Sequence, residues 1–159
     1  MKIGVVSDTH SLGIPKQLVD DFKSVDLIIH AGDFSSVRDL KFFTALGNCK
    51  AVYGNTDEAE LQKRLPRRDI LQLEKVSVGV FHGEGSPRNI VETVKQEFSK
   101  DKIQVIIFGH SHQPLNEKIN GILLFNPGSP NDMVRAPYRS YGILEIKDGQ
   151  AVGKIITVE

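Results

Sequence analysis

Short apolar runs rich in β-branched residues alternate with amphipathic segments along the first two thirds of this 159-residue chain. The runs have the length and composition of buried strands, and the segments between them repeat apolar residues at helical spacing. This alternation is typical of right-handed βαβ units, in which helices cover a parallel sheet. We expect strands at residues 3–7, 26–31, 51–53, 76–81 and 105–108, and helices at residues 14–23, 37–46 and 88–98.

The last third of the chain has the pattern of β-hairpins. Asn120-Gly121 and Asp148-Gly149 each separate two strand-like runs, and such pairs favour tight hairpin turns. The strands that we expect to pair are 115–119 with 122–125, and 141–146 with 151–158. The predicted fold class is therefore α/β, with two mixed sheets packed face to face and helices on the outer faces. Residues 1–159 are expected to form one domain, in which the charged segment 58–71 has no clear assignment.

Charge and composition exclude several classes of protein. The 20 Lys and Arg residues balance the 20 Asp and Glu residues, so a long nucleic acid held by bulk electrostatics is not expected. The single cysteine excludes an internal disulfide. No apolar stretch approaches the ~18 residues of a membrane span, and the apolar run at the N-terminus is too short for a secretory signal. We expect a cytoplasmic protein with no membrane partner.

Five of the apolar runs end in side chains that carry oxygen or imidazole donors. In open α/β sheets, binding sites form beyond the carboxyl ends of the strands, so these side chains are expected to meet at one rim. Asp-x-His and His-x-His also place two side chains on the same side of an extended chain. The candidate residues are Asp8, His10, Asp33, Asn55, His82, His110 and His112.

Seven donors are too many for one four-coordinate ion. They suit two divalent ions that share a carboxylate, which is the usual device for hydrolysing phosphate esters. No thiolate takes part, so soft ions are disfavoured. We expect two divalent ions, with Mn²⁺ as the leading candidate and Ni²⁺, Zn²⁺ or Fe²⁺ as alternatives.

The order of these motifs resembles that of the calcineurin-like metallophosphoesterase superfamily. The blocks that carry the resemblance are Asp8-x-His10, Gly32-Asp33, Gly54-Asn55-x-Asp57, His82 and Gly109-His110-x-His112. A single block is common in proteins, but five in order are specific. Asn126-Pro127-Gly128-Ser129 and the terminal hairpins extend the resemblance to the small single-domain prokaryotic phosphodiesterases of that superfamily.

The resemblance implies a four-layer α/β-β/α sandwich with a dinuclear metal centre. Asp8, His10 and His112 would hold the first ion, Asn55, His82 and His110 the second, and Asp33 would bridge them. A metal-bound hydroxide would then attack phosphorus in line.

One position departs from the superfamily pattern. The full motif is Gly-Asn-His-Asp/Glu, and its histidine assists the leaving group, whereas this chain has Thr56 there. A hydroxyl is not a general acid near neutral pH, so the catalytic residue is left unassigned. The small phosphodiesterases commonly lack this histidine as well. The change therefore predicts a preference for substrates with good leaving groups.

Other residues have weaker claims to the site. His30 lies inside a predicted strand, where a hydrogen-bonding role behind the ligands is favoured over a direct one. Asp57 is expected either to cap the next helix or to orient a ligand. Arg135, in a proline-containing loop, could clamp phosphate together with Asn55. Four aromatic residues are expected in the core because of their helical spacing: Phe22, Phe42, Phe43 and Phe98.

The sequence leaves more than one function open. The leading hypothesis is a metal-dependent phosphodiesterase acting on a small or nucleotide-like diester. A second is a non-catalytic scaffold, because a subunit of the retromer coat has the metallophosphoesterase fold. A third is a phosphomonoesterase or nuclease. A homodimer or higher oligomer is also possible.

Overall fold

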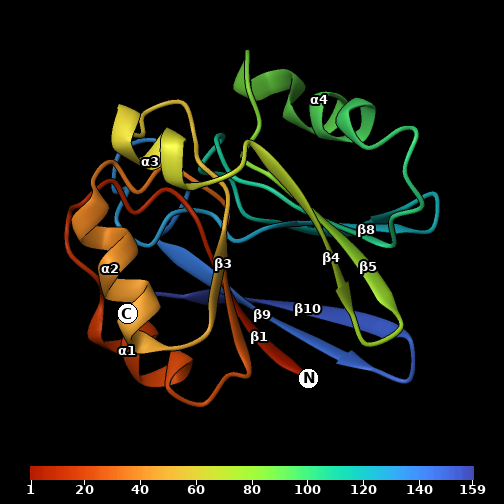
Figure 1. The fold of residues 1–159 in the computed structure, drawn as a ribbon, viewed down its shortest axis with the longest axis horizontal. Helices are drawn as coiled ribbons and strands as arrows, with labels where there is room; N and C mark the ends of the chain where they lie inside the picture. The colour runs from red at the N-terminus through yellow and green to blue at the C-terminus, as the bar shows by residue number, and fades with distance from the viewer.

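The computed structural model, which describes residues 1–159, contains two five-stranded mixed sheets packed face to face. The first sheet has the order β10-β9-β1-β2-β3, and the second has the order β4-β5-β6-β8-β7 (Figure 1). The strands of the first sheet are β1 (Lys2–Val6), β2 (Leu27–His30), β3 (Cys49–Ala51), β9 (Ser140–Lys147) and β10 (Gln150–Thr157). Those of the second are β4 (Arg68–Leu73), β5 (Val76–Phe81), β6 (Val105–Ile107), β7 (Leu115–Ile119) and β8 (Ile122–Asn126).

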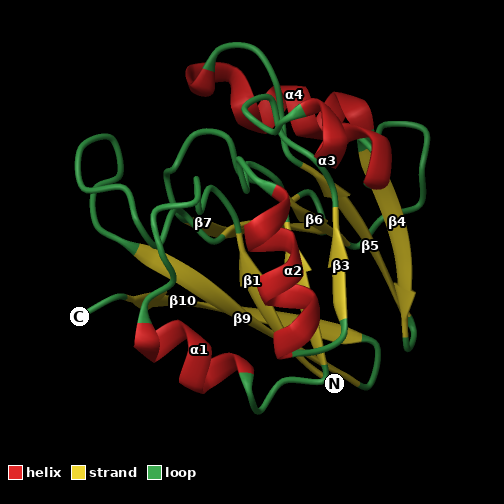
Figure 2. Ribbon diagram, turned by 60° about the vertical axis from the view of Figure 1, so that its left-hand side comes forward, coloured by secondary structure: helices red, strands yellow, loops and turns green.

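Helices cover the outer face of each sheet (Figure 2). On the first sheet, α1 (Lys16–Phe22), α2 (Val37–Leu46) and α3 (Ala59–Arg64) bury residues such as Phe43 and Leu61. On the second, α4 (Ile90–Glu97) follows the 3-10 turn η1 (Pro87–Asn89) and packs Val94 into a separate cluster. A third cluster, of 15 buried residues, fills the space between the two sheets. The predicted four-layer α/β sandwich is confirmed. No helix combines the length and the apolar composition that a membrane crossing requires.

The main differences from the sequence prediction concern element boundaries and one unassigned segment. β3 begins two residues earlier than predicted, at Cys49, and the predicted helix 88–98 consists of η1 followed by α4. The segment 58–71 contains α3 and most of β4, an edge strand antiparallel to β5. Both hairpins form, and Asn120 and Gly121 have φ of 50° and 83°, which is consistent with a type I′ turn.

One aromatic prediction was wrong. Phe42 was expected in the core with Phe43, but it is 39% exposed while Phe43 is fully buried. Consecutive residues point about 100° apart around a helix, so α2 cannot direct both rings at the sheet. Phe42 instead packs edge-on against Phe43, with ring centroids 5.5 Å apart.

Glycines in the first sheet allow a large side chain of the second sheet to approach closely. The ring of Phe125, on β8, is fully buried between the sheets. A Cβ on Gly142 or on Gly153 would lie 2.5 Å from opposite edges of this ring. The two glycines, on the paired strands β9 and β10, therefore form the seat into which Phe125 packs.

Replacing Gly142→Ala should destabilise the protein by about 1–3 kcal/mol, because the added methyl group overpacks the seat of Phe125. Urea unfolding measures the loss. Gly47→Ala is the matched control, since a Cβ there would meet its nearest neighbour at an ordinary 3.5 Å. Equal stability of both variants would contradict this account of the sheet interface.

Candidate metal centre

The structure brings all seven predicted donor residues to one rim. They lie in the loops that follow β1, β2, β3, β5 and β6, which are the parallel strands of both sheets. The two sheets meet closely here. A Cβ on Gly109, after β6, would lie only 1.9 Å from Ser7 Oγ and 2.6 Å from an Asp8 carboxylate oxygen, after β1. Glycine at this position lets the loop of one sheet reach the site of the other.

Left-handed backbone conformations turn the chain sharply at the end of several strands. Non-glycine residues rarely have positive φ, although Asn, Asp and His adopt it more readily than most. Such angles at several neighbouring positions are typical of functional sites. Five of the seven donors have φ between 50° and 69°: Asp8, His10, Asp33, His110 and His112.

The first group of donors consists of Asp8, His10 and His112, whose ligand atoms lie within 4.8 Å of one another. His112 Nε2 is 3.1 Å from Asp8 Oδ1, and His10 Nε2 is 3.2 Å from His112 Nε2. Asp8 is fully buried and His112 is 7% exposed. A carboxylate and two imidazole nitrogens thus face one small volume.

The second group is built around His82 and Asp33. His82 Nε2 lies 3.2 Å from Asp33 Oδ2 and 3.2 Å from Asn55 Oδ1. His110 Nδ1 is 3.0 Å from the same amide oxygen of Asn55. Asp33 Oδ2 also lies 3.9 Å from His10 Nε2, so this carboxylate faces both groups.

The ring nitrogens that point away from the site have acceptors of their own. His82 Nδ1 lies 2.7 Å from the carbonyl of Ala31, and His110 Nε2 lies 2.7 Å from the carbonyl of Gly85. Since a carbonyl only accepts, each of these nitrogens donates its proton. The other nitrogen of each ring is then left to face the site with a free electron pair when the ring is neutral. Hydrogen bonds of this kind fix the tautomer of metal-binding histidines.

Asp132 has the same role towards His112. Its Oδ2 lies 2.5 Å from His112 Nδ1, while His112 Nε2 faces the first group. Asp132 was missed by the sequence analysis. It lies 20 residues after His112, in an irregular loop, and no local pattern connects the two.

Electrostatics at the site favour a bound cation. Asp8 Oδ1 is the one buried side-chain oxygen or nitrogen in the structure without a hydrogen-bond partner. Burial alone would raise the pKa of Asp8, but the nearby histidines lower it well below the ordinary range. Conversely, burial would lower the pKa of His82 and His112, and the adjacent carboxylates raise both to about 9. The residues present therefore fit a divalent ion, which would partner the orphaned oxygen and replace those protons.

His30 and Asp57 support the rim from behind. Burial lowers the pKa of His30 to about 3, so the ring is neutral. Its Nδ1 accepts from the backbone N–H of Gly32, and its Nε2 lies 3.1 Å from Thr9 Oγ1. The Asp57 carboxylate accepts from the backbone N–H groups of Asp33, Ser35 and Gly54 at 2.7–3.0 Å.

Asp57 therefore holds the loops of two donor residues together. It makes no cap on α3, whose N-cap residue is Glu58. Of the two expected roles, orienting a candidate ligand is the one that its hydrogen bonds fit.

The turn at residues 126–129 lies directly beneath the site. Asn126 is fully buried and donates through Nδ2 to the carbonyl of Gly109. Ser129 donates through Oγ to the carbonyl of Asp8 at 2.8 Å. Arg135 and Thr56, at the rim, line an open pocket with His10 and His112.

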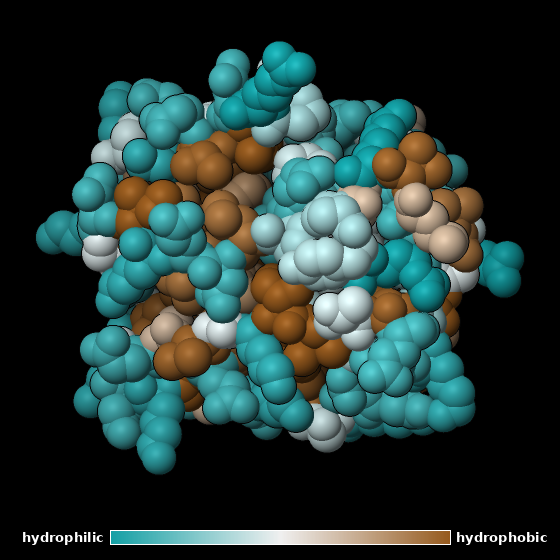
Figure 3. All heavy atoms as spheres, turned by 180° about the vertical axis from the view of Figure 1, so that it is seen from behind, coloured by the Kyte–Doolittle hydropathy of each residue, from teal (hydrophilic) through white to brown (hydrophobic).

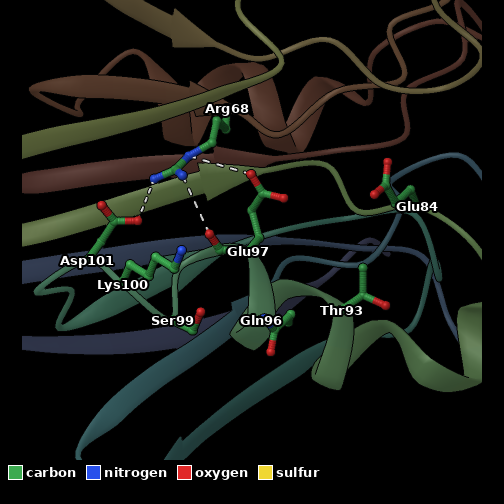
Figure 4. Close-up of a pocket in the computed structure, with 8 residues that line it drawn as sticks. All are labelled: Arg68, Glu84, Thr93, Gln96, Glu97, Ser99, Lys100 and Asp101. Carbon is green, nitrogen blue, oxygen red and sulfur yellow. Dashed lines mark hydrogen bonds and ion pairs between the residues drawn. The ribbon is translucent and has the colours of Figure 1, made fainter.

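A second hollow elsewhere on the surface does not share this chemistry. It lies between α4 and β4, has a volume of about 510 Å³ and is lined only by polar and charged residues (Figure 4). Arg68 there pairs with Asp101 at 2.7 Å and with Glu97 at 3.7 Å. Because the charges of Arg68, Glu97 and Asp101 are paired with one another, these three residues are not free to bind a charged ligand in the hollow.

A two-sheet α/β sandwich with clustered carboxylate, imidazole and amide groups at its rim is an arrangement that suits metal-dependent hydrolysis of phosphate esters. Comparison with known families agrees. The calcineurin-like phosphoesterase superfamily domain matches residues 1–149, and the chain belongs to this superfamily.

Relatives support the assignment, and solved structures share the fold. The chain is 37% identical to a probable metallophosphoesterase of Methanocaldococcus jannaschii, across 100% of this chain and 82% of that protein. It is 30% identical to a phosphodiesterase of the same organism, across 80% and 83%. The structure of an archaeal phosphodiesterase superposes with a TM-score of 0.78, at 26% identity, across 98% of this chain and 100% of the other. Vps29 of Entamoeba histolytica, in complex with Zn²⁺, superposes with a TM-score of 0.75, at 20% identity, across all of both chains.

Adding Mn²⁺ to metal-free protein should raise the midpoint of thermal unfolding by about 5–10 °C at a hundredfold excess over the dissociation constant. Asp8→Asn should abolish the rise, because it removes the charge of the buried carboxylate whose Oδ1 has no hydrogen-bond partner. Differential scanning calorimetry measures both. Asp148→Asn, in an exposed hairpin turn, is the matched control and should retain the full rise. An equal rise in the Asp8 variant would contradict the assignment.

Proposed function

We propose that this protein is a dinuclear metal-dependent phosphodiesterase acting on a small diester. The observation that carries the proposal is the completeness of the donor set: every one of the seven side chains faces a shared rim, and Asp33 faces both groups. Three of the four candidate histidines are also anchored through their outward nitrogens by contacts of 2.7 Å or less. The likeness to a phosphodiesterase 30% identical in sequence favours diesters over monoesters.

In this proposal, Asp8, His10 and His112 would hold the first ion, Asn55, His82 and His110 would hold the second, and Asp33, which faces both groups, would be shared between them. When bound, the two ions activate a water molecule and neutralise charge on the phosphate. Mn²⁺ is the ion that we propose. The donors are oxygen and imidazole nitrogen, which suit Mn²⁺ but also Zn²⁺, Ni²⁺ and Fe²⁺.

The chain's own groups orient the substrate. Asn55 directs its carbonyl oxygen at His82 and His110, which leaves its amide N–H groups to donate to a phosphate oxygen. Arg135 lines the pocket beside His10 and His112 and supplies a cation there. A monoanionic diester needs less positive charge than a dianionic monoester, and this pocket contains a single arginine and no lysine.

Thr56 occupies the position from which a general acid would assist the leaving group. Its backbone N–H donates to Asp33 Oδ1 at 2.9 Å, and its hydroxyl lies 3.4 Å from His10 Nδ1. The backbone contact positions the carboxylate, but the hydroxyl cannot deliver a proton to a leaving oxygen at neutral pH. The proposed enzyme therefore depends on leaving groups that depart as stable anions.

A scaffold function is the second candidate, because Vps29 shares the fold. Figure 3 shows several apolar areas separated by hydrophilic side chains, on the face opposite to that of Figure 1. The complete donor set favours catalysis over this alternative. Size-exclusion chromatography of tagged protein distinguishes them, since a scaffold should form a heteromer that survives replacement of the donor residues.

Asp33→Ala and His82→Ala should each lower the rate of hydrolysis of bis(p-nitrophenyl) phosphate by more than about a hundredfold. Each substitution removes a donor that no neighbouring residue replaces. Release of p-nitrophenolate by Mn²⁺-loaded protein measures the rate. Val152→Ala, on exposed β10, is the control and should keep wild-type activity. Wild-type protein that is loaded with metal but inert towards this diester would overturn the proposed function.

The rate constant kcat/KM should fall steadily across a series of methyl aryl phosphates as the pKa of the phenol rises, because the rim provides no general acid. Thr56→Val should leave the slope of this dependence unchanged, since it removes the hydroxyl and keeps the side-chain shape. A steeper slope in the variant would show that the hydroxyl assists the leaving group and would contradict the role given to Thr56.

A further inference from the structure

Large apolar side chains stand exposed beside the candidate metal centre. Met133 is 80% exposed, Val134 is 91% exposed and Leu12 is 70% exposed. These three residues, which we call the apolar shelf, line one pocket of about 500 Å³. His10 and His112, donors of the first group, line the same pocket. The shelf is therefore continuous with the rim on which the phosphate is proposed to bind.

Hydrogen bonds hold the shelf loop in place. Asp132 Oδ1 accepts from the backbone N–H of Val134 at 2.7 Å and from that of Arg135 at 2.9 Å. The other oxygen of Asp132 contacts His112. The same carboxylate that orients a candidate metal ligand thus determines where Val134 lies.

A second set of hydrogen bonds connects the loop of Leu12 with the loop of Met133 and Val134. Asn131 donates through Nδ2 to the carbonyl of Thr9 at 2.7 Å and to that of Gly13 at 2.8 Å. These carbonyls flank the loop that carries Leu12, so Leu12 and Met133 are tied to one framework. These hydrogen bonds hold the loop in one conformation. The exposed apolar side chains of the shelf therefore keep a fixed position beside the rim.

We propose that the apolar shelf binds an aromatic or similarly apolar ester group of the substrate while the phosphate occupies the metal rim. This inference rests on the proposed function and adds the class of substrate. The pocket has the size of typical small-molecule sites. Three of its nine lining residues are apolar and six are polar or charged, so the pocket offers both kinds of contact that an amphiphilic ester needs. Arg135 lines the same pocket, and its guanidinium group is suited to contact the face of an aromatic ring or a phosphate oxygen.

Two ligands that differ only in the apolar group test the proposal. Phenylphosphonate and methylphosphonate present the same anionic head, and isothermal titration calorimetry of Mn²⁺-loaded protein gives the dissociation constant of each. Wild-type protein should bind phenylphosphonate about tenfold or more tightly than methylphosphonate, since the ring adds several buried carbons. The variant with both Met133→Ser and Val134→Ser should reduce this ratio by about fivefold or more.

Both replaced side chains are exposed, so the folded state should persist, and the circular dichroism spectrum verifies it. Val152→Ser is the matched control because Val152 is also exposed, at 68%, but lies on β10 outside this pocket. Its ratio should equal that of the wild type. Competitive inhibition constants for hydrolysis should follow the same order as the dissociation constants.

The possible outcomes separate the two proposals. If neither phosphonate binds the metal-loaded protein, the proposed phosphate site fails. If both bind with equal affinity, or if the double variant keeps the wild-type ratio, the shelf proposal alone is overturned. A double variant that changes from dimer to monomer by light scattering, with an unchanged ratio, would assign the shelf to contacts between copies of the chain.

Discussion

Burial of two carboxylates, Asp8 and Asp33, at the junction of the two sheets is the constraint on which the rest of this site depends. They are 0% and 2% exposed, and an isolated buried charge is strongly unfavourable unless it is paired or binds a metal. The surrounding features all compensate for that charge. Imidazoles face the carboxylates, backbone N–H groups donate to them, and one oxygen of Asp8 remains without a partner. Negative charge with an open position is what a cation site requires.

The parts of the fold that sequence reasoning predicted are those governed by local patterns. β5 and α2 have the predicted boundaries because β-branched alternation and helical spacing are properties of the segments themselves. The hairpin at Asn120-Gly121 follows from the backbone preference of two residues. The seven donors could be found because each follows an apolar run, and because the carboxyl ends of parallel strands share a rim.

The features that sequence reasoning missed depend on contacts between distant segments. β4 begins with the charged residues Arg68 and Asp69, yet it pairs with β5 along its whole length and packs Leu71 and Leu73 against the core between the sheets. The guanidinium group and aliphatic stem of Arg68 lie over the ring of Phe98 at 4.5 Å, so the first part of the strand carries no apolar signal in the sequence. Asp132 is a similar case. Its contact with His112 exists only because the loop after the turn at Ser129 returns to the rim.

Two independent features of the rim converge on the same chemistry. Thr56 is not a general acid at neutral pH, so a leaving oxygen must depart as an anion. Phenolic oxygens, with an ordinary pKa of about 10, do so far more readily than alkyl oxygens. The apolar shelf, for its part, offers a surface that suits an aromatic group and gives little to a short polar alcohol. The first feature acts on the transition state and the second on binding. A substrate with an aromatic ester group satisfies both, whereas an alkyl diester would be bound weakly and cleaved slowly at the same site.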